Sequence, residues 1–151
     1  NSKNMELICI GSAKNSYYNY LIELKNKLEK KYGTRKIKLL TNISKQETIQ
    51  YVRDASLYLM GSTWEAFSIS LIESMAAGTP YISTNVGVAR YLPGGIICNT
   101  PDDMAYWIDI FMDNPTIRTH FAQIVQNYYK QHLTISSKVE LLNKLLTENH
   151  I

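Results

Sequence analysis

Two glutamates, Glu65 and Glu73, are the only carboxylates between positions 61 and 89, and no lysine, arginine or histidine lies in that range. A carboxylate held among apolar side chains is costly unless hydrogen-bond donors or a polar cleft satisfy it. One carboxylate can accept hydrogen bonds from two neighbouring hydroxyl groups of a ligand. The pattern therefore favours a site that binds a polyhydroxyl compound.

Two structural explanations of the glutamates stay open at this point. Glu65 can be an ordinary acidic residue near a helix N-terminus, where the helix dipole stabilises it weakly. Glu73 can pair with a lysine of a neighbouring helix.

The segment around the glutamates predicts a strand, a turn and a helix. The helix covers residues 67–77 and is stopped by Gly78 and Pro80. Its first backbone amides, those of Phe67, Ser68 and Ile69, have no partner inside the helix and form an anion site suited to phosphate. Amides that bind phosphate beside two carboxylates suit a nucleotide-sugar.

The rest of the chain supplies the elements that position this segment. Strands are predicted from short apolar runs at residues 6–12, 36–40, 56–60, 81–83 and 96–98. An apolar stripe predicts a helix that ends near Gly33, and the last third of the chain is helical. Helix starts are predicted from the capping boxes Ser44/Glu47 and Thr100/Asp103, from Asn114-Pro115 and from Thr134.

Strands that alternate with helices predict an α/β fold: a Rossmann-like, doubly wound parallel sheet with helices on both faces. Its 151 residues suit one domain. Such sheets bind ligands at the carboxyl ends of their strands, which points to the turns at 11–15, 41–44, 61–66 and 84–95. The third of these turns contains Glu65.

Composition excludes several classes of protein. The chain is 45% hydrophobic and 19% charged, as in soluble globular proteins. Cys9 and Cys98 lie in apolar runs, which favours buried thiols over a disulfide or a metal site. Seven basic residues fall between Lys25 and Lys38. We favour a solvated helix face with Glu23–Lys27 and Lys25–Glu29 pairs over a surface for nucleic acid or anionic lipid.

The motif "S-T-W-E-A-F-S-I-S-L-I-E-S-M-A-A-G-T-P-Y-I-S-T-N-V-G", residues 62–87, resembles the signature of family-4 retaining glycosyltransferases. Their pattern there is roughly P-S-x-x-E-G-F-G-x-x-x-x-E-A-M-A-x-G-x-P-V-I-x-T-x-x-G. The resemblance implies the C-terminal half of a GT-B fold and extends over residues 5–147. It implies an enzyme that transfers a sugar from a nucleoside-diphosphate-sugar to a glycan or lipid-linked saccharide, with retention of anomeric configuration.

The resemblance also implies roles for single residues. Glu65 would be the catalytic residue: it would contact the transferred sugar and stabilise positive charge at its anomeric centre. Glu73 would bind the ribose hydroxyls, and Gly11 would let the first turn approach the nucleotide. The donor-binding set implied in this way is Gly11, Thr41, Asn42, Ile43, Ala66, Phe67, Ser68, Ile69 and Glu73, with residues 41–43 lining the base. No metal or other cofactor is expected.

Departures from the family pattern shape the remaining expectations. Ala66 and Ser68 replace common glycines, and Val88, Arg90 and Tyr91 stand where the family often has a glycine and a glutamate. An earlier strand and helix and an N-terminal acceptor domain, a partner of this domain in relatives, are absent from these 151 residues. We therefore expect an incomplete donor-binding domain that is inactive alone, with nucleotide-sugar and acceptor as its partners and no nucleic acid.

Two other interpretations compete with sugar transfer. A catalytically inert nucleotide-sugar-binding module with a regulatory role stays open. A flavodoxin-like or receiver-like domain is disfavoured, because Gly11, Ser12 and Ala13 follow the first strand instead of acidic residues. By resemblance, the setting is cytoplasmic polysaccharide biosynthesis, with association at the inner membrane face left open.

Overall fold

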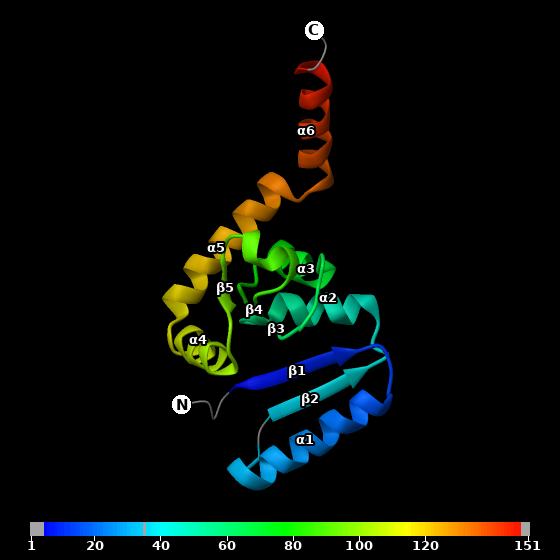
Figure 1. Cartoon of the computed structure of the whole chain (residues 1–151), viewed down its shortest axis with the longest axis vertical. Helices are drawn as coiled ribbons and strands as arrows, with labels where there is room; N and C mark the ends of the chain where they lie inside the picture. Colours follow the sequence, from blue (N-terminus) through cyan, green and yellow to red (C-terminus); the bar gives the residue numbers. More distant parts are fainter. Residues whose placement is uncertain (1–4, 35, 149–151) are drawn as a thin grey trace. The chain divides into compact units, whose positions relative to one another are not determined.

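The computed structural model describes residues 5–34 and 36–148, so Arg35 and His150 lie outside the described residues. It divides the chain into two compact units, residues 1–51 and residues 52–151. The α/β class is confirmed, since parallel strands alternate with helices along both units (Figure 1). The five strands of the described residues are divided between a two-stranded and a three-stranded sheet. Strand patterns in a sequence indicate the elements but not this pairing.

The first unit consists of a strand, a helix, a second strand and the start of another helix. Strand β1 (Glu6–Gly11) pairs in parallel with β2 (Lys36–Thr41), and α1 (Ser16–Tyr32) connects them. Helix α2 (Lys45–Asp54) begins in this unit and ends in the next.

None of the described residues of the first unit is buried, so the prediction of a buried first strand is wrong. Leu7 in β1 is 44% exposed and Tyr17 in α1 is 65% exposed. Two strands and one helix cannot enclose a core, because each side chain meets a neighbour on one side only.

The second unit is built on strands β3 (Tyr58–Met60), β4 (Tyr81–Thr84) and β5 (Gly95–Cys98). All neighbours are parallel and β4 is the middle strand. A short 3₁₀ helix, η2 (Gly87–Tyr91), follows β4 and was not predicted.

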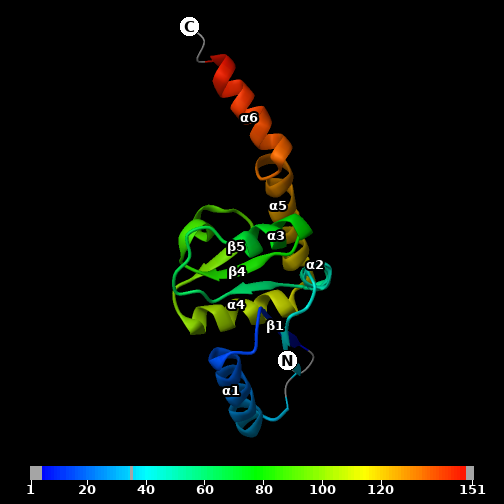
Figure 2. The same ribbon diagram turned by 90° about the vertical axis from the view of Figure 1, so that its right-hand side faces the viewer.

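Helices of the second unit cover both faces of its sheet, as predicted. They are α3 (Ile69–Ala77), α4 (Pro101–Asp113) and α5 (Pro115–His132). The last helix, α6 (Ile135–Glu148), follows α5 and extends away from the sheet (Figure 1). In Figure 2, α3 and α4 lie on opposite sides of the sheet. Tyr81 enters one core cluster with Met75 of α3 and Val125 of α5, whereas Ile82 enters a second cluster with Phe111 of α4. Neighbouring residues of β4 therefore serve two cores.

Helix starts follow the capping signals with one exception. In the first capping box, the Ser44 amide donates to Glu47 Oε2 at 2.8 Å and the Glu47 amide donates to Ser44 Oγ at 3.2 Å. Hydrogen bonds from the Ser44 backbone and side chain to the Glu47 carboxyl lower the pKa of that carboxyl. The Thr100/Asp103 box forms as well, and Thr134 caps α6 through the Ser137 amide.

Asn114 is the exception, since its side chain makes no capping bond to α5. Its Nδ2 instead donates to the Ile110 carbonyl at 2.8 Å. Asn114 is the C-cap of α4 as well as the residue before Pro115, and its side-chain amide bonds to the last turn of α4 and not to α5.

The other sequence-based expectations have mixed outcomes. Both cysteines are free thiols; Cys98 is buried, whereas Cys9 is half-buried. Burial raises the pKa of both thiols, and the Asp103 carboxylate raises that of Cys98 further. Lys25 and Glu29 lie 4.0 Å apart, whereas the predicted Glu23–Lys27 pair is not among the ion pairs of the described residues. In residues 5–34 and 36–148, no helix is long and apolar enough to cross a bilayer.

Candidate functional site

The loop between β3 and α3 carries the first glutamate, and α3 begins two residues later than predicted. Ser68 is the N-cap: its Oγ accepts a hydrogen bond from the Leu71 amide at 3.3 Å. Phe67 and Ser68 therefore precede the helix, and Ile69 is its first residue. Within the described chain, no group accepts a hydrogen bond from the amides of Phe67, Ser68 or Ile69. These amides remain available to an anion.

Glu65 lies in this loop and is half-buried. Its Oε1 accepts a hydrogen bond from the Ala66 amide at 3.1 Å. The Ala66 amide is therefore directed to the Glu65 carboxylate, which leaves the other carboxylate oxygen for a ligand. No basic side chain of the described residues forms an ion pair with Glu65.

Glu73 lies one turn into α3 and is also half-buried, beside the fully buried Ser74. In the part of the chain that the structure describes, it forms no ion pair and no hydrogen bond through its side chain. The lysine pair that would have explained Glu73 structurally is absent from those residues. A half-buried carboxylate without a protein donor is suited to the hydroxyl groups of a ligand.

Hydroxyl groups line the start of α3. Ser70 Oγ lies 2.7 Å from the Tyr58 hydroxyl of β3 and 3.1 Å from Ser68 Oγ. Sequence reasoning missed Ser70 and Tyr58. The available signal was the S-x-S spacing directly before an apolar helix, with a tyrosine in the preceding strand.

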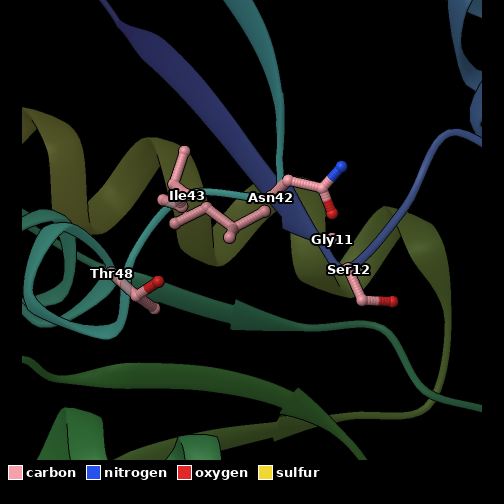
Figure 3. A pocket seen from close by; sticks show the side chains of 6 residues that line it. Gly11, Ser12, Asn42, Ile43 and Thr48 are labelled. Carbon is pink, nitrogen blue, oxygen red and sulfur yellow. The ribbon is translucent and has the colours of Figure 1, made fainter.

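The first unit holds a pocket of about 610 Å³ at the carboxyl ends of β1 and β2 (Figure 3). Its lining residues are Ile10, Gly11, Ser12, Asn42, Ile43 and Thr48. The pocket is an open depression at this edge of the sheet and not an enclosed cavity. Its lining combines an amide, two hydroxyls and an isoleucine pair, which suits a flat polar ring system.

Three of the four residues predicted in this unit line that pocket, and Thr41 does not. Asn42 has φ of 57°, a left-handed conformation that asparagine tolerates better than most residues. Sequence reasoning missed Ser12, which directly follows Gly11, and Thr48, whose Oγ1 donates to the Ser44 carbonyl at 3.0 Å in the first turn of α2.

The predicted site residues are thus divided between the units. Gly11, Thr41, Asn42 and Ile43 belong to the first unit; Glu65, Ala66, Phe67, Ser68, Ile69 and Glu73 belong to the second. Within residues 5–34 and 36–148, no three His, Cys, Asp or Glu side chains gather as metal ligands would. The candidate site residues can form hydrogen bonds through carboxylates, amides and hydroxyls.

Comparison with known proteins identifies the family and the fold of this chain. Residues 2–128 match the family described as glycosyl transferases group 1. The C-terminal domain of a group 1 family protein, LpcC, from Francisella tularensis is 19% identical with a TM-score of 0.76, covering 86% of this chain and 70% of that one. A comparison with curated protein sequences found no match.

Two longer structures share the fold. HepE from Anabaena, in complex with UDP, is 18% identical with a TM-score of 0.78, covering 95% of this chain and 41% of HepE. Sucrose-phosphate synthase from Thermosynechococcus elongatus is 16% identical with a TM-score of 0.76, covering 95% and 38%. The chain therefore spans about two fifths of these proteins, and the fold is that of a GT-B glycosyltransferase C-terminal domain. On the family match, the chain belongs to the glycosyl transferases group 1.

Proposed function

We propose that this chain is the donor-binding domain of a family-4 retaining glycosyltransferase and binds a nucleoside-diphosphate-sugar. The observation that carries the proposal is Glu73, a half-buried carboxylate that no protein donor satisfies in the described residues. Ribose hydroxyls would supply the missing donors. HepE, which shares the fold, crystallised with UDP and with UDP-glucose, which makes UDP the first nucleotide to test.

The remaining roles follow the chemistry of each group. The unpartnered amides of Phe67, Ser68 and Ile69 would bind the diphosphate. The pocket at Gly11, Asn42 and Ile43 would hold the base, with Thr41 in the adjoining strand end.

Glu65 would be the catalytic residue, contacting the transferred sugar through its carboxylate. Retention would proceed by attack on the same face as the departing diphosphate, within a tight ion pair. In that route the carboxylate stabilises positive charge at the anomeric carbon and does not attack it. Because amides and the helix start would bind the diphosphate, we propose that transfer needs no metal, and EDTA should leave it unchanged.

The acceptor would be a glycan or a lipid-linked saccharide, bound by an N-terminal domain. We propose that the 151-residue chain alone transfers no sugar, because it holds groups for the donor only. Sugar transfer by this chain in a turnover assay would refute that part. A cytoplasmic setting in polysaccharide biosynthesis, at the inner membrane face, is part of the same proposal.

The test measures sugar transfer and UDP binding for two variants, Glu65→Gln and Glu73→Ala. Both are made in a polypeptide that includes the acceptor domain. Glu65→Gln should lower the transfer rate by about a thousandfold, because charge stabilisation is lost, while UDP still binds. Glu73→Ala should weaken UDP binding about tenfold through lost hydrogen bonds. Glu140→Gln, an exposed carboxylate of α6, is the matched control and should change neither.

Unchanged transfer in Glu65→Gln would instead favour the inert nucleotide-sugar-binding module. Unchanged UDP binding in Glu73→Ala would overturn the donor site itself.

A further inference from the structure

Strand β4 holds the loop that carries Glu65 on both sides of that residue. Before Glu65, Thr84 Oγ1 donates to the Ser62 carbonyl at 2.6 Å, close to the end of β3. At Glu65 and Ala66, the loop is contacted by η2, which is itself bonded to Tyr81. All these groups belong to the second unit.

The contact between η2 and the loop is made by backbone groups. The Val88 amide donates to the Ala66 carbonyl at 3.1 Å. Gly87 has φ of +48°, and a Cβ at this position would overlap the Glu65 and Ala66 carbonyl oxygens. Only glycine at position 87 therefore allows η2 to approach the backbone of the Glu65 loop so closely.

Tyr81 fixes η2 from inside the core. Its hydroxyl lies 2.7 Å from the Leu92 carbonyl and 3.2 Å from the Ala89 carbonyl, at the end of η2. The ring is fully buried and crosses Gly95 of β5, where any Cβ would overlap it. A phenylalanine would fill the same space and leave the two carbonyls without this donor.

The protonation state of this tyrosine suits a permanent donor. Burial raises the pKa of Tyr81 above its ordinary value of 10.0, with a smaller contribution from Tyr128. The hydroxyl therefore keeps its proton throughout the neutral range.

We propose that Tyr81 and Thr84 are positioning residues that hold the Glu65 loop at Ser62 and at Ala66, on either side of Glu65. Tyr81 acts through η2 and Thr84 acts directly on Ser62. The catalytic consequence rests on the proposed function, whereas the structural consequence is measurable without it. Because Glu65 must meet a reacting sugar with sub-ångström precision, a loosened loop should slow transfer more than it weakens nucleotide binding.

The structural test uses ¹⁹F NMR of the chain labelled with 5-fluorotryptophan. The chain has two tryptophans, and Trp64 directly precedes Glu65 while Trp107 packs in the other core cluster. A Trp107→Phe variant assigns the two signals. Tyr81→Phe should shift or broaden the Trp64 signal and leave the Trp107 signal unchanged.

Tyr129→Phe is the matched control, since Tyr129 packs against the same core cluster and makes no side-chain hydrogen bond among the described residues. An equal response of Trp64 to Tyr81→Phe and Tyr129→Phe would overturn the proposal. If Tyr81→Phe unfolds the chain, the Thr84→Val and Thr84→Ser variants are compared instead. Only Thr84→Val, which lacks the hydroxyl, should change the Trp64 signal. Equal spectra of the two variants would overturn the proposal.

The kinetic test uses the polypeptide with its acceptor domain. Tyr81→Phe should lower kcat about tenfold and leave the donor KM nearly unchanged. A parallel change of kcat and KM, or no change in either, would overturn the positioning role. Wild-type protein that binds none of UDP, GDP and ADP and transfers no sugar would refute the proposed function. The NMR test of the positioning role does not depend on that outcome.

Discussion

The two units of this chain differ in where their stability comes from. The second unit encloses two core clusters, with Tyr81, Phe111 and Val125 fully buried. The first unit has no buried side chain among its described residues, and Tyr20 is 55% exposed. Both units nevertheless place polar groups at the carboxyl ends of parallel strands.

Because of this difference in burial, the two units should hold their loops with different rigidity. A packed core fixes neighbouring backbone through contacts on every side, so the Glu65 loop can be held to a defined geometry. A sheet of two strands with one helix holds its loops less firmly. On the proposed function, the second unit would position the catalytic loop and the first unit would supply the less firmly held pocket for the base.

Hydrogen exchange should show the largest difference between the units. Amides of β4 are expected to exchange at least about a hundredfold more slowly than those of β1, because β4 opens only with its core. Mass spectrometry of peptides that cover residues 81–84 and 6–11 measures this. Equal protection of the two strands would remove the basis of the comparison.

Removing one core ring should separate the units by stability. Phe111 packs edge-on against Phe121 with ring centroids 5.1 Å apart. Phe111→Ala is expected to cost about 3–5 kcal/mol of unfolding free energy, through lost transfer energy and a cavity.

The counterpart in the first unit is Tyr20, which stacks on Tyr17 at 6.0 Å. Tyr20→Ala is expected to cost about 0.5 kcal/mol, as exposed sites usually do. Urea unfolding followed by circular dichroism compares the two variants, and similar losses would contradict the contrast in burial.

Alkaline pH should destabilise the second unit through Tyr81. The pKa of this buried hydroxyl is raised, so above about pH 10 the unfolded chain releases a proton that the folded chain keeps. Stability is therefore full below that pH and falls as pH rises further. Tyr81→Phe should remove this component, and Tyr129→Phe should not. Thermal melts between pH 8 and about 11 measure it; identical slopes in wild type and Tyr81→Phe would contradict the assignment.

Sequence reasoning predicted the helices and strands closely because their signals are local. The Ser44/Glu47 and Thr100/Asp103 boxes each join residues three apart, and both form. The start of α3 was misplaced because the Ser68 capping signal was overlooked in favour of the apolar Phe67.

Features that depend on distant partners escaped prediction. The 3₁₀ helix η2 is held by the Tyr81 hydroxyl and by the hydrogen bond from the Val88 amide to the Ala66 carbonyl, and no local pattern shows these. The division into two sheets likewise depends on strand pairing.

Candidate site residues divide in the same way. Glu73 could be singled out because its surroundings lack charge, and it indeed pairs with no base in the described chain. Thr48 could not be singled out from the sequence, because it lies in α2 and lines the pocket only once that helix has folded back beside Asn42 and Ile43.

The most direct test of the donor site is calorimetric titration of UDP, GDP and ADP into the chain, as wild type and as Glu73→Ala. We expect the wild type to bind one of these diphosphates, and Glu73→Ala to bind it about tenfold more weakly. Glu140→Gln should bind as the wild type does. Equal affinity of the wild type and Glu73→Ala, or no binding of any of the three by the wild type, would contradict the account.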